Sequence, residues 1–116
     1  FQAAINVLKA VAGQTILVMG DMAELGEKAY EMHCQIGAFA QQAGINQMFC
    51  VGDLSAGAAD LFGGSHFARQ DDLLKALASS LKNMSDEKVK TTVLIKGSRS
   101  SGMDKVVKKL LEKGVL

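Results

Sequence analysis

Apolar residues along this chain fall into two kinds of pattern, short unbroken runs and longer helical stripes. The unbroken runs are Thr15–Met19, Met48–Val51 and Thr92–Ile95, and a glycine follows each of them within two residues. Runs of this length, rich in β-branched residues and closed by glycine, favour buried strands over helices. A weaker, shorter candidate for a further strand is His66–Ala68.

The segments between these runs place apolar residues three or four positions apart, which is typical of helices with one buried face. Helices are predicted over residues 1–13, 28–43, 54–61, from 71 or 72 to about 81, and from about 103 onward. Gly13, Gly44 and Gly63 should end the first three of these helices. Asp71 or Asp72 should cap the fourth.

Short apolar strands that alternate with helices predict βαβ units, hence an α/β fold with a mainly parallel sheet. The length of 116 residues suits one domain. Right-handed crossovers bring every strand-to-helix loop to the carboxyl edge of such a sheet, where ligands bind. We therefore expect Gly20–Glu27, Gly52–Asp53 and Lys96–Gly102 to line one crevice.

Composition excludes several classes of partner. Thirteen basic residues against twelve acidic ones leave a formal charge of +1, which gives no reason to expect nucleic acid or a membrane surface. The longest unbroken apolar run, Ile16–Met19, is far shorter than the roughly 20 residues of a spanning helix. Cys34 and Cys50 form no recognisable pair, so free thiols in a reducing, cytoplasmic compartment are expected.

The beginning of the chain predicts that it is a piece of a larger protein. The sequence starts at Phe1 without an initiating methionine, inside a predicted helix. A basic leader and a cleavage region, the marks of a signal peptide, are missing from residues 1–12.

The segment Lys96–Gly102 is the strongest local signal for chemistry. It joins a predicted buried strand to a helix and supplies two cations, three hydroxyls and two glycines. Backbone N–H groups at a helix start, together with a guanidinium fork, suit a carboxylate or a phosphate. The alternative is a capped turn with solvated charges. Neither Gly-Lys-Ser/Thr nor Gly-x-Gly-x-x-Gly occurs in the chain, so no nucleotide-binding fingerprint is present.

The acidic segment Gly20–Glu27 brings Asp21, Glu24 and Glu27 to the same edge. These carboxylates could hold an ammonium group or a metal ion. They could equally stabilise the start of the next helix, which the residues alone favour.

The two histidines give weaker signals. His33 lies close to a helical apolar stripe, where a structural role is more common than a catalytic one, and His66 is assigned no role. No second histidine, cysteine or acid has metal-ligand spacing, so no metal site is expected. From the residues alone the chain has a binding edge without a catalytic centre.

Two motifs carry a resemblance to a known family. They are Val18–Gly26, followed by His33 and Gly37, and Leu94–Ser100, followed by Met103 and Val106-Val107. In this order and separation they resemble the C-terminal domain of the Mur ligase family, over essentially the whole chain. Within the family, the chain most resembles the members that add D-alanyl-D-alanine to UDP-N-acetylmuramoyl-tripeptide in peptidoglycan synthesis.

The resemblance implies that residues 1–116 are a Rossmann-like, three-layer αβα domain, the third domain of a larger cytoplasmic ligase. Residues 1–13 would then continue a helix from the upstream part. In that enzyme an N-terminal domain holds the UDP-sugar peptide, and a central ATPase domain binds ATP and Mg2+. A carboxylate is activated as an acyl phosphate and attacked by the amine of D-alanyl-D-alanine, and closure of the C-terminal domain assembles the site.

Roles carry over from the resemblance residue by residue. The group expected to grip the dipeptide carboxylate is Lys96, Gly97, Ser98, Arg99 and Ser100. Asp21 and Glu24 would face the nucleotide and the incoming amine, and His33 would either touch ligand or fix their loop. The family's phosphate-binding and metal-binding residues belong to the central domain, so this chain alone is expected to be inactive.

Two other functions remain open from the sequence. One is a non-catalytic module of the same fold that binds a small carboxylate or phosphate. The other, weaker one is an interaction domain whose C-terminal helix docks a partner through Lys108, Lys109 and Lys113.

Overall fold

Strands and helices alternate along the chain in the computed structural model, which describes residues 2–10, 13–83, 91–97 and 102–112. The elements are α1 (Gln2–Lys9), β1 (Gln14–Gly20), the 3-10 helix η1 (Ala23–Lys28), α2 (Ala29–Ala43), β2 (Gln47–Val51), α3 (Ala56–Phe62), β3 (Ser65–Phe67), α4 (Gln70–Asn83), β4 (Thr91–Lys96) and α5 (Met103–Glu112).

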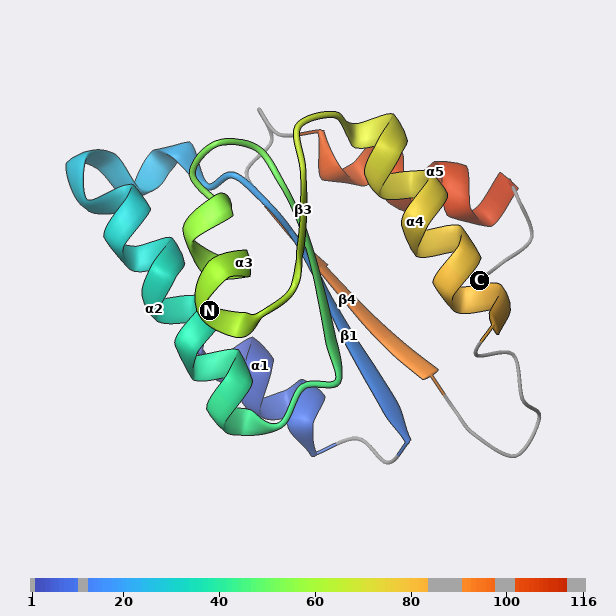
Figure 1. Cartoon of the computed structure of the whole chain (residues 1–116), viewed down its shortest axis with the longest axis horizontal. Helices are drawn as coiled ribbons and strands as arrows, with labels where there is room; N and C mark the ends of the chain where they lie inside the picture. Colours follow the sequence, from blue (N-terminus) through green and yellow to red (C-terminus); the bar gives the residue numbers. More distant parts are fainter. Residues whose placement is uncertain (1, 11–12, 84–90, 98–101, 113–116) are drawn as a thin grey trace.

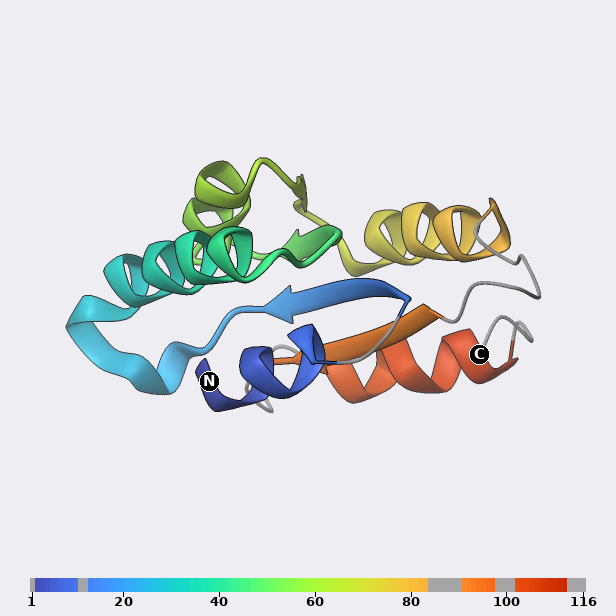
Figure 2. The same cartoon turned by 90° about the horizontal axis from the view of Figure 1, so that it is seen from below.

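The strands form one sheet in the order β3-β2-β1-β4, and every neighbouring pair is parallel. Helices α1, α2 and α3 cover one face of this sheet, and α4 and α5 cover the other (Figure 1). Seen from the side, β3 and α3 lie toward one edge of the sheet, and β4 lies toward the other (Figure 2). The predicted α/β fold with a parallel sheet is confirmed.

Strand β1 shows why the central run is apolar without interruption. Ile16 and Val18 pack with α4 and α5, while Leu17 and Met19 pack with α1, α2 and α3. All four side chains are fully buried. Since successive side chains of a strand point to opposite faces, a strand covered on both faces has no polar side.

Helices α2 and α3 approach each other unusually closely because glycine stands at their contact. A Cβ atom at Gly37 of α2 would overlap the backbone of Ala58 in α3, and one at Gly57 would overlap the sulfur of Cys34. These two helices therefore pack backbone against backbone on the α1–α3 face.

Two boundaries differ from the sequence-based expectation. Helix α1 ends at Lys9 rather than near Gly13, which adopts a φ of 95° before β1. Helix α4 begins at Gln70, and the carbonyl of Arg69 already accepts a hydrogen bond from the N–H of Leu73. Asp71 and Asp72 consequently do not cap α4. They lie in its first turn, where the helix dipole favours them.

The segment expected as a loop after β1 also contains a helical turn. Residues Ala23–Lys28 form η1, which Gly26, at φ 76° and ψ −147°, separates from α2. The connector expected over residues 83–90 lies outside the described residues, apart from Asn83 at the end of α4.

Both cysteines are free, as expected. Cys34 is half-buried, whereas Cys50 is fully buried in β2. Burial, and secondarily the nearby Asp21 carboxylate, raises the pKa of Cys50 to about 12. Within the described residues, no helix is both long and apolar enough to cross a membrane.

Candidate functional site

The strand order creates a topological switch point between β1 and β4. From β1 the chain moves outward through β2 to β3, and it then returns to place β4 on the opposite side of β1. In open parallel sheets, ligands bind outside the carboxyl ends of the strands at such a point. Met19 of β1 is in register with Lys96 of β4, so the segments that follow them start side by side. The two sequence motifs therefore meet at the switch point.

The cationic segment is described at its two ends. Lys96 is exposed at the end of β4, and Gly97 is half-buried. At the other end, the carbonyl of Gly102 accepts hydrogen bonds from the side-chain amide of Gln70 and from the N–H of Lys105, both at 3.0 Å. The predicted ligand contacts Ser98, Arg99 and Ser100 lie outside the described residues.

Asp21, the first residue after β1, has its carboxylate directed toward the turn between β2 and α3. Oδ1 accepts a hydrogen bond from the N–H of Ser55 at 2.9 Å, and Oδ2 accepts one from the N–H of Leu54 at 3.2 Å. The side chain is half-buried. It therefore joins two of the three segments that the sequence placed at this edge.

His33 is fully buried on α2, and both of its ring nitrogens bond to backbone. Nε2 lies 3.1 Å from the N–H of Met22, and Nδ1 lies beside the carbonyl of Ala29. This pairing is consistent with the neutral tautomer in which Nδ1–H donates and Nε2 accepts. His33 thus ties the backbone of the first motif to α2, and its ring is closed to solvent.

The remaining acids of the first motif lie in η1. Glu24 belongs to that turn, and its side chain is outside the described part of the chain. Glu27 is exposed.

The structure adds two residues that the sequence had not singled out for this edge. Ser55 is fully buried, and its hydroxyl donates to the carbonyl of Val51 at 2.8 Å. His66 places Nε2 at 2.7 Å from the carbonyl of Gly52, which has a φ of 107°. Only the Gly52-Asp53 pair, a glycine and an acid directly after a strand, marked this turn in the sequence.

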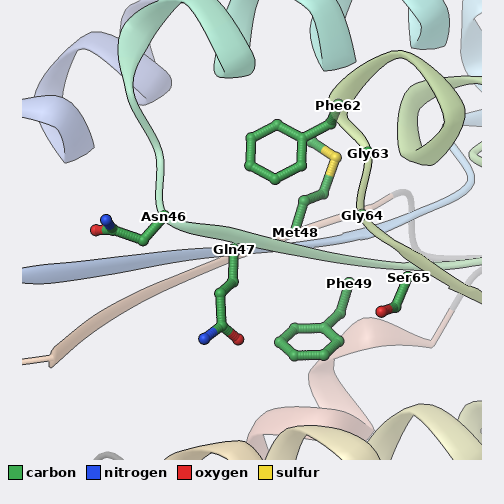
Figure 3. Close-up of a pocket in the computed structure, with 8 residues that line it drawn as sticks. All are labelled: Asn46, Gln47, Met48, Phe49, Phe62, Gly63, Gly64 and Ser65. Atoms are coloured by element: carbon green, nitrogen blue, oxygen red, sulfur yellow. The ribbon is translucent and has the colours of Figure 1, made fainter.

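A cavity of about 230 Å3 lies elsewhere, at the amino ends of β2 and β3 (Figure 3). It is lined by Asn46, Gln47, Met48, Phe49, Phe62, Gly63, Gly64 and Ser65. Met48 and Phe62 lie on one side of β2, and Gln47 and Phe49 point to the other. Because none of these side chains is ionisable, the cavity has no charged group to pair with a carboxylate, a phosphate or an ammonium. The carboxyl edge is the better candidate site on chemical grounds.

The carboxyl edge at the switch point is where ligands bind in open parallel sheets of this class. Sequence similarity assigns the chain to a family. Residues 1–99 match the family model described as Mur ligase, glutamate ligase domain, and the chain therefore belongs to the Mur ligase family.

Within that family, similar proteins include UDP-N-acetylmuramoyl-tripeptide–D-alanyl-D-alanine ligases. The chain is 44% identical over 110 residues to the one from Buchnera aphidicola subsp. Acyrthosiphon pisum, covering 94% of this chain and 23% of the relative. It is 42% identical over 113 residues to the one from Escherichia coli, covering 97% of this chain and 24% of the relative.

Solved structures agree. MurF from Acinetobacter baumannii superposes with a TM-score of 0.85 at 26% identity, over 96% of this chain and 24% of that one. MurF from Thermotoga maritima in complex with ADP gives a TM-score of 0.69 at 26% identity, over 97% and 26% of the two chains. The chain thus spans about a quarter of the length of the relatives it matches.

Proposed function

We propose that this chain is the acceptor-binding, closing domain of an ATP-dependent ligase that adds D-alanyl-D-alanine to UDP-N-acetylmuramoyl-tripeptide in peptidoglycan synthesis. The observation that carries the proposal is the pairing of Met19 with Lys96, which brings both family motifs to the switch point of the sheet. The similarity to whole ligases favours this function over a non-catalytic module of the same fold.

The segment Lys96–Ser100 is proposed to bind the carboxylate of D-alanyl-D-alanine. Lys96 supplies an exposed ammonium at the end of β4, and Arg99 supplies a guanidinium that can bond both carboxylate oxygens. The same segment leads into α5, whose first-turn N–H groups and dipole favour an anion. Hydrogen bonds from these charged groups to a carboxylate are stronger than neutral ones.

The segment Asp21–Glu24 is proposed to face the nucleotide and the incoming amine. His33 supports this segment from α2, since its buried ring accepts a hydrogen bond from the N–H of Met22. Contact between ligand and Glu24 stays a prediction.

ATP and Mg2+ are proposed to bind mainly to a central domain outside this chain. Among the described residues, no three histidine, cysteine or acidic side chains are grouped so that they could hold a metal ion. The sequence also has no Gly-Lys-Ser/Thr phosphate loop. The described part of the chain therefore offers no ligand set that fits the metal, and this chain alone is proposed to be inactive. A cytoplasmic location likewise stays a prediction.

The direct test is phosphate release by the full-length protein that carries this domain. The assay contains ATP, UDP-N-acetylmuramoyl-tripeptide and D-alanyl-D-alanine, and each substrate is left out in turn. Release that requires both acceptor and donor is the expected result. A folded full-length protein that binds D-alanyl-D-alanine but releases no phosphate would instead be a binding module.

A further inference from the structure

We infer that Asp21 is a positioning residue, which clamps the β2–α3 turn to the segment after β1 and does not itself bind ligand. The inference rests on the proposed function, since the segment it holds is the one proposed to face nucleotide and amine. Four observations lead to it.

The first observation is where the carboxylate points. Its two oxygens accept hydrogen bonds from the consecutive amides of Leu54 and Ser55, which lie more than thirty positions further along the chain. Hydrogen bonds to an ionised acceptor are about twice as strong as neutral ones. The carboxylate is therefore committed to the backbone of another loop.

The second observation is the fit of the turn around the carboxylate. Gly52 adopts a φ of 107°, and a Cβ atom there would overlap the carboxylate of Asp21. Glycine is needed at this position both for its backbone conformation and for the close approach of Asp21.

The third observation is that the turn is held from its far side as well. The carbonyl of Gly52 accepts hydrogen bonds from His66 Nε2 at 2.7 Å and from the hydroxyl of Ser55 at 3.2 Å. The N–H of Gly52 donates to the carbonyl of Phe67 at 3.3 Å. Asp21 thus grips a turn that β3 already fixes.

The fourth observation is a second anchor on the next residue. While the side chain of Asp21 is bound to the β2–α3 turn, the N–H of Met22 donates to His33 on α2. Two neighbouring residues of the motif are held by two different elements, directly beside the strand end that pairs with Lys96. This arrangement fixes the backbone that follows β1 beside the end of β4.

The clamp is tested first by hydrogen exchange in the full-length protein, followed at residue resolution. Asp21→Asn should speed exchange of the Leu54 and Ser55 amides roughly 10- to 150-fold, the range set by one charged hydrogen bond. The matched control is Asp60→Asn, which changes an exposed carboxylate on α3 and should leave both rates unchanged. Unchanged rates in Asp21→Asn would overturn the inference.

Positioning is separated from ligand contact by a double-mutant cycle on kcat/KM for D-alanyl-D-alanine. Ser55→Ala weakens the same turn from its buried side and removes no group from the segment proposed to face ligand. If Asp21 acts through the turn, both single variants lower kcat/KM. The decrease in kcat/KM of the double variant is then at least about twofold smaller than the product of the two single decreases.

Two results would contradict a positioning role. One is a loss of activity in Asp21→Asn with a silent Ser55→Ala, and the other is a pair of effects that multiply. Either would make Asp21 a ligand contact. A wild-type protein without ligation would defeat the proposed function instead, and the exchange rates would still decide whether the clamp exists.

Discussion

Large apolar side chains fill the core on both faces of the sheet, but the helices on the two faces meet in different ways. On the α1–α3 face, α2 and α3 meet through glycine and alanine, so that their backbones touch at Gly37 and Ala58. On the α4–α5 face, the space is filled by large branched side chains, among them Leu73, Leu77 and Leu110. Close backbone contact fixes the distance between two helices, whereas large side chains can adjust their rotamers.

This difference matters for the candidate site because each motif is anchored to a different face. The segment after β1 is held by His33 on α2 and by the turn that begins α3. The segment after β4 is held at Gly102 by Gln70 of α4. The first motif is thus anchored at two successive residues, Asp21 and Met22, whereas the described anchor beyond β4 is at Gly102.

The largest expected effect is on the reactivity of Cys50, which is buried on the α1–α3 face. Its pKa is raised from an ordinary 9.0 to about 12, which favours the neutral thiol. At pH 8 the thiolate fraction should be about a thousandfold lower in the folded protein than in urea, and alkylation should slow accordingly. The sign for stability follows: the contribution of the thiol is complete below pH 9 and is lost as the pH rises toward 12.

Alkylation followed by mass spectrometry checks this, with Cys50→Ser to assign the signal of Cys34. Equal reactivity of Cys50 in folded and unfolded protein would show that the face is open.

On the α4–α5 face, the expected vulnerability is loss of volume. Leu77→Ala should lower the free energy of unfolding by about 2–5 kcal/mol, because it leaves a cavity among fully buried neighbours. Urea titration measures the change, and Lys75→Ala on the exposed side of α4 should stay within about 0.5 kcal/mol. A cost below 1 kcal/mol would mean that the large side chains close the gap.

On the α1–α3 face, the expected vulnerability is the reverse, a gain of volume. Gly37→Ala should cost about 1–3 kcal/mol even though alanine is the better helix former, since the added methyl meets the Ala58 backbone. Gln35→Ala, two residues earlier on the exposed side of α2, is the control. A stabilised Gly37→Ala protein would erase the contrast between the two faces.

The smallest effect is expected at the anchor of the second motif. Gln70→Ala removes the hydrogen bond to the Gly102 carbonyl and should cost about 0.5–1.5 kcal/mol. Gln42→Ala on α2, which is exposed, serves as the matched change. A loss at Gln70 no larger than that at Gln42 would show that this hydrogen bond does not anchor Gly102.

Much of the fold could be predicted from local patterns. The unbroken apolar runs marked β1, β2 and β4 because strands buried on both faces have no polar positions. Gly44 and Gly63 marked the ends of α2 and α3 because both adopt the left-handed conformation there. The start of α4 could not be placed, since it depends on the backbone bond from Leu73 to Arg69 and not on the acids that follow.

The candidate site was predictable only in part. The periodicity of α2 placed His33 near the apolar stripe and so favoured a structural role, in line with its buried hydrogen bonds. The pairing of Asp21 with Ser55 was not predictable, because it joins positions 34 apart through the packing of two loops. The same holds for His66, whose partner is a backbone carbonyl.

The proposed function depends most on the cationic segment that follows β4. The decisive measurement is kcat/KM for D-alanyl-D-alanine in the full-length protein carrying Arg99→Ala, compared with Lys108→Ala on the exposed side of α5. Loss of one charged hydrogen bond predicts a decrease of roughly 10- to 150-fold for Arg99→Ala, with Lys108→Ala close to wild type. An unchanged kcat/KM in Arg99→Ala would contradict the assignment of this edge to the acceptor carboxylate.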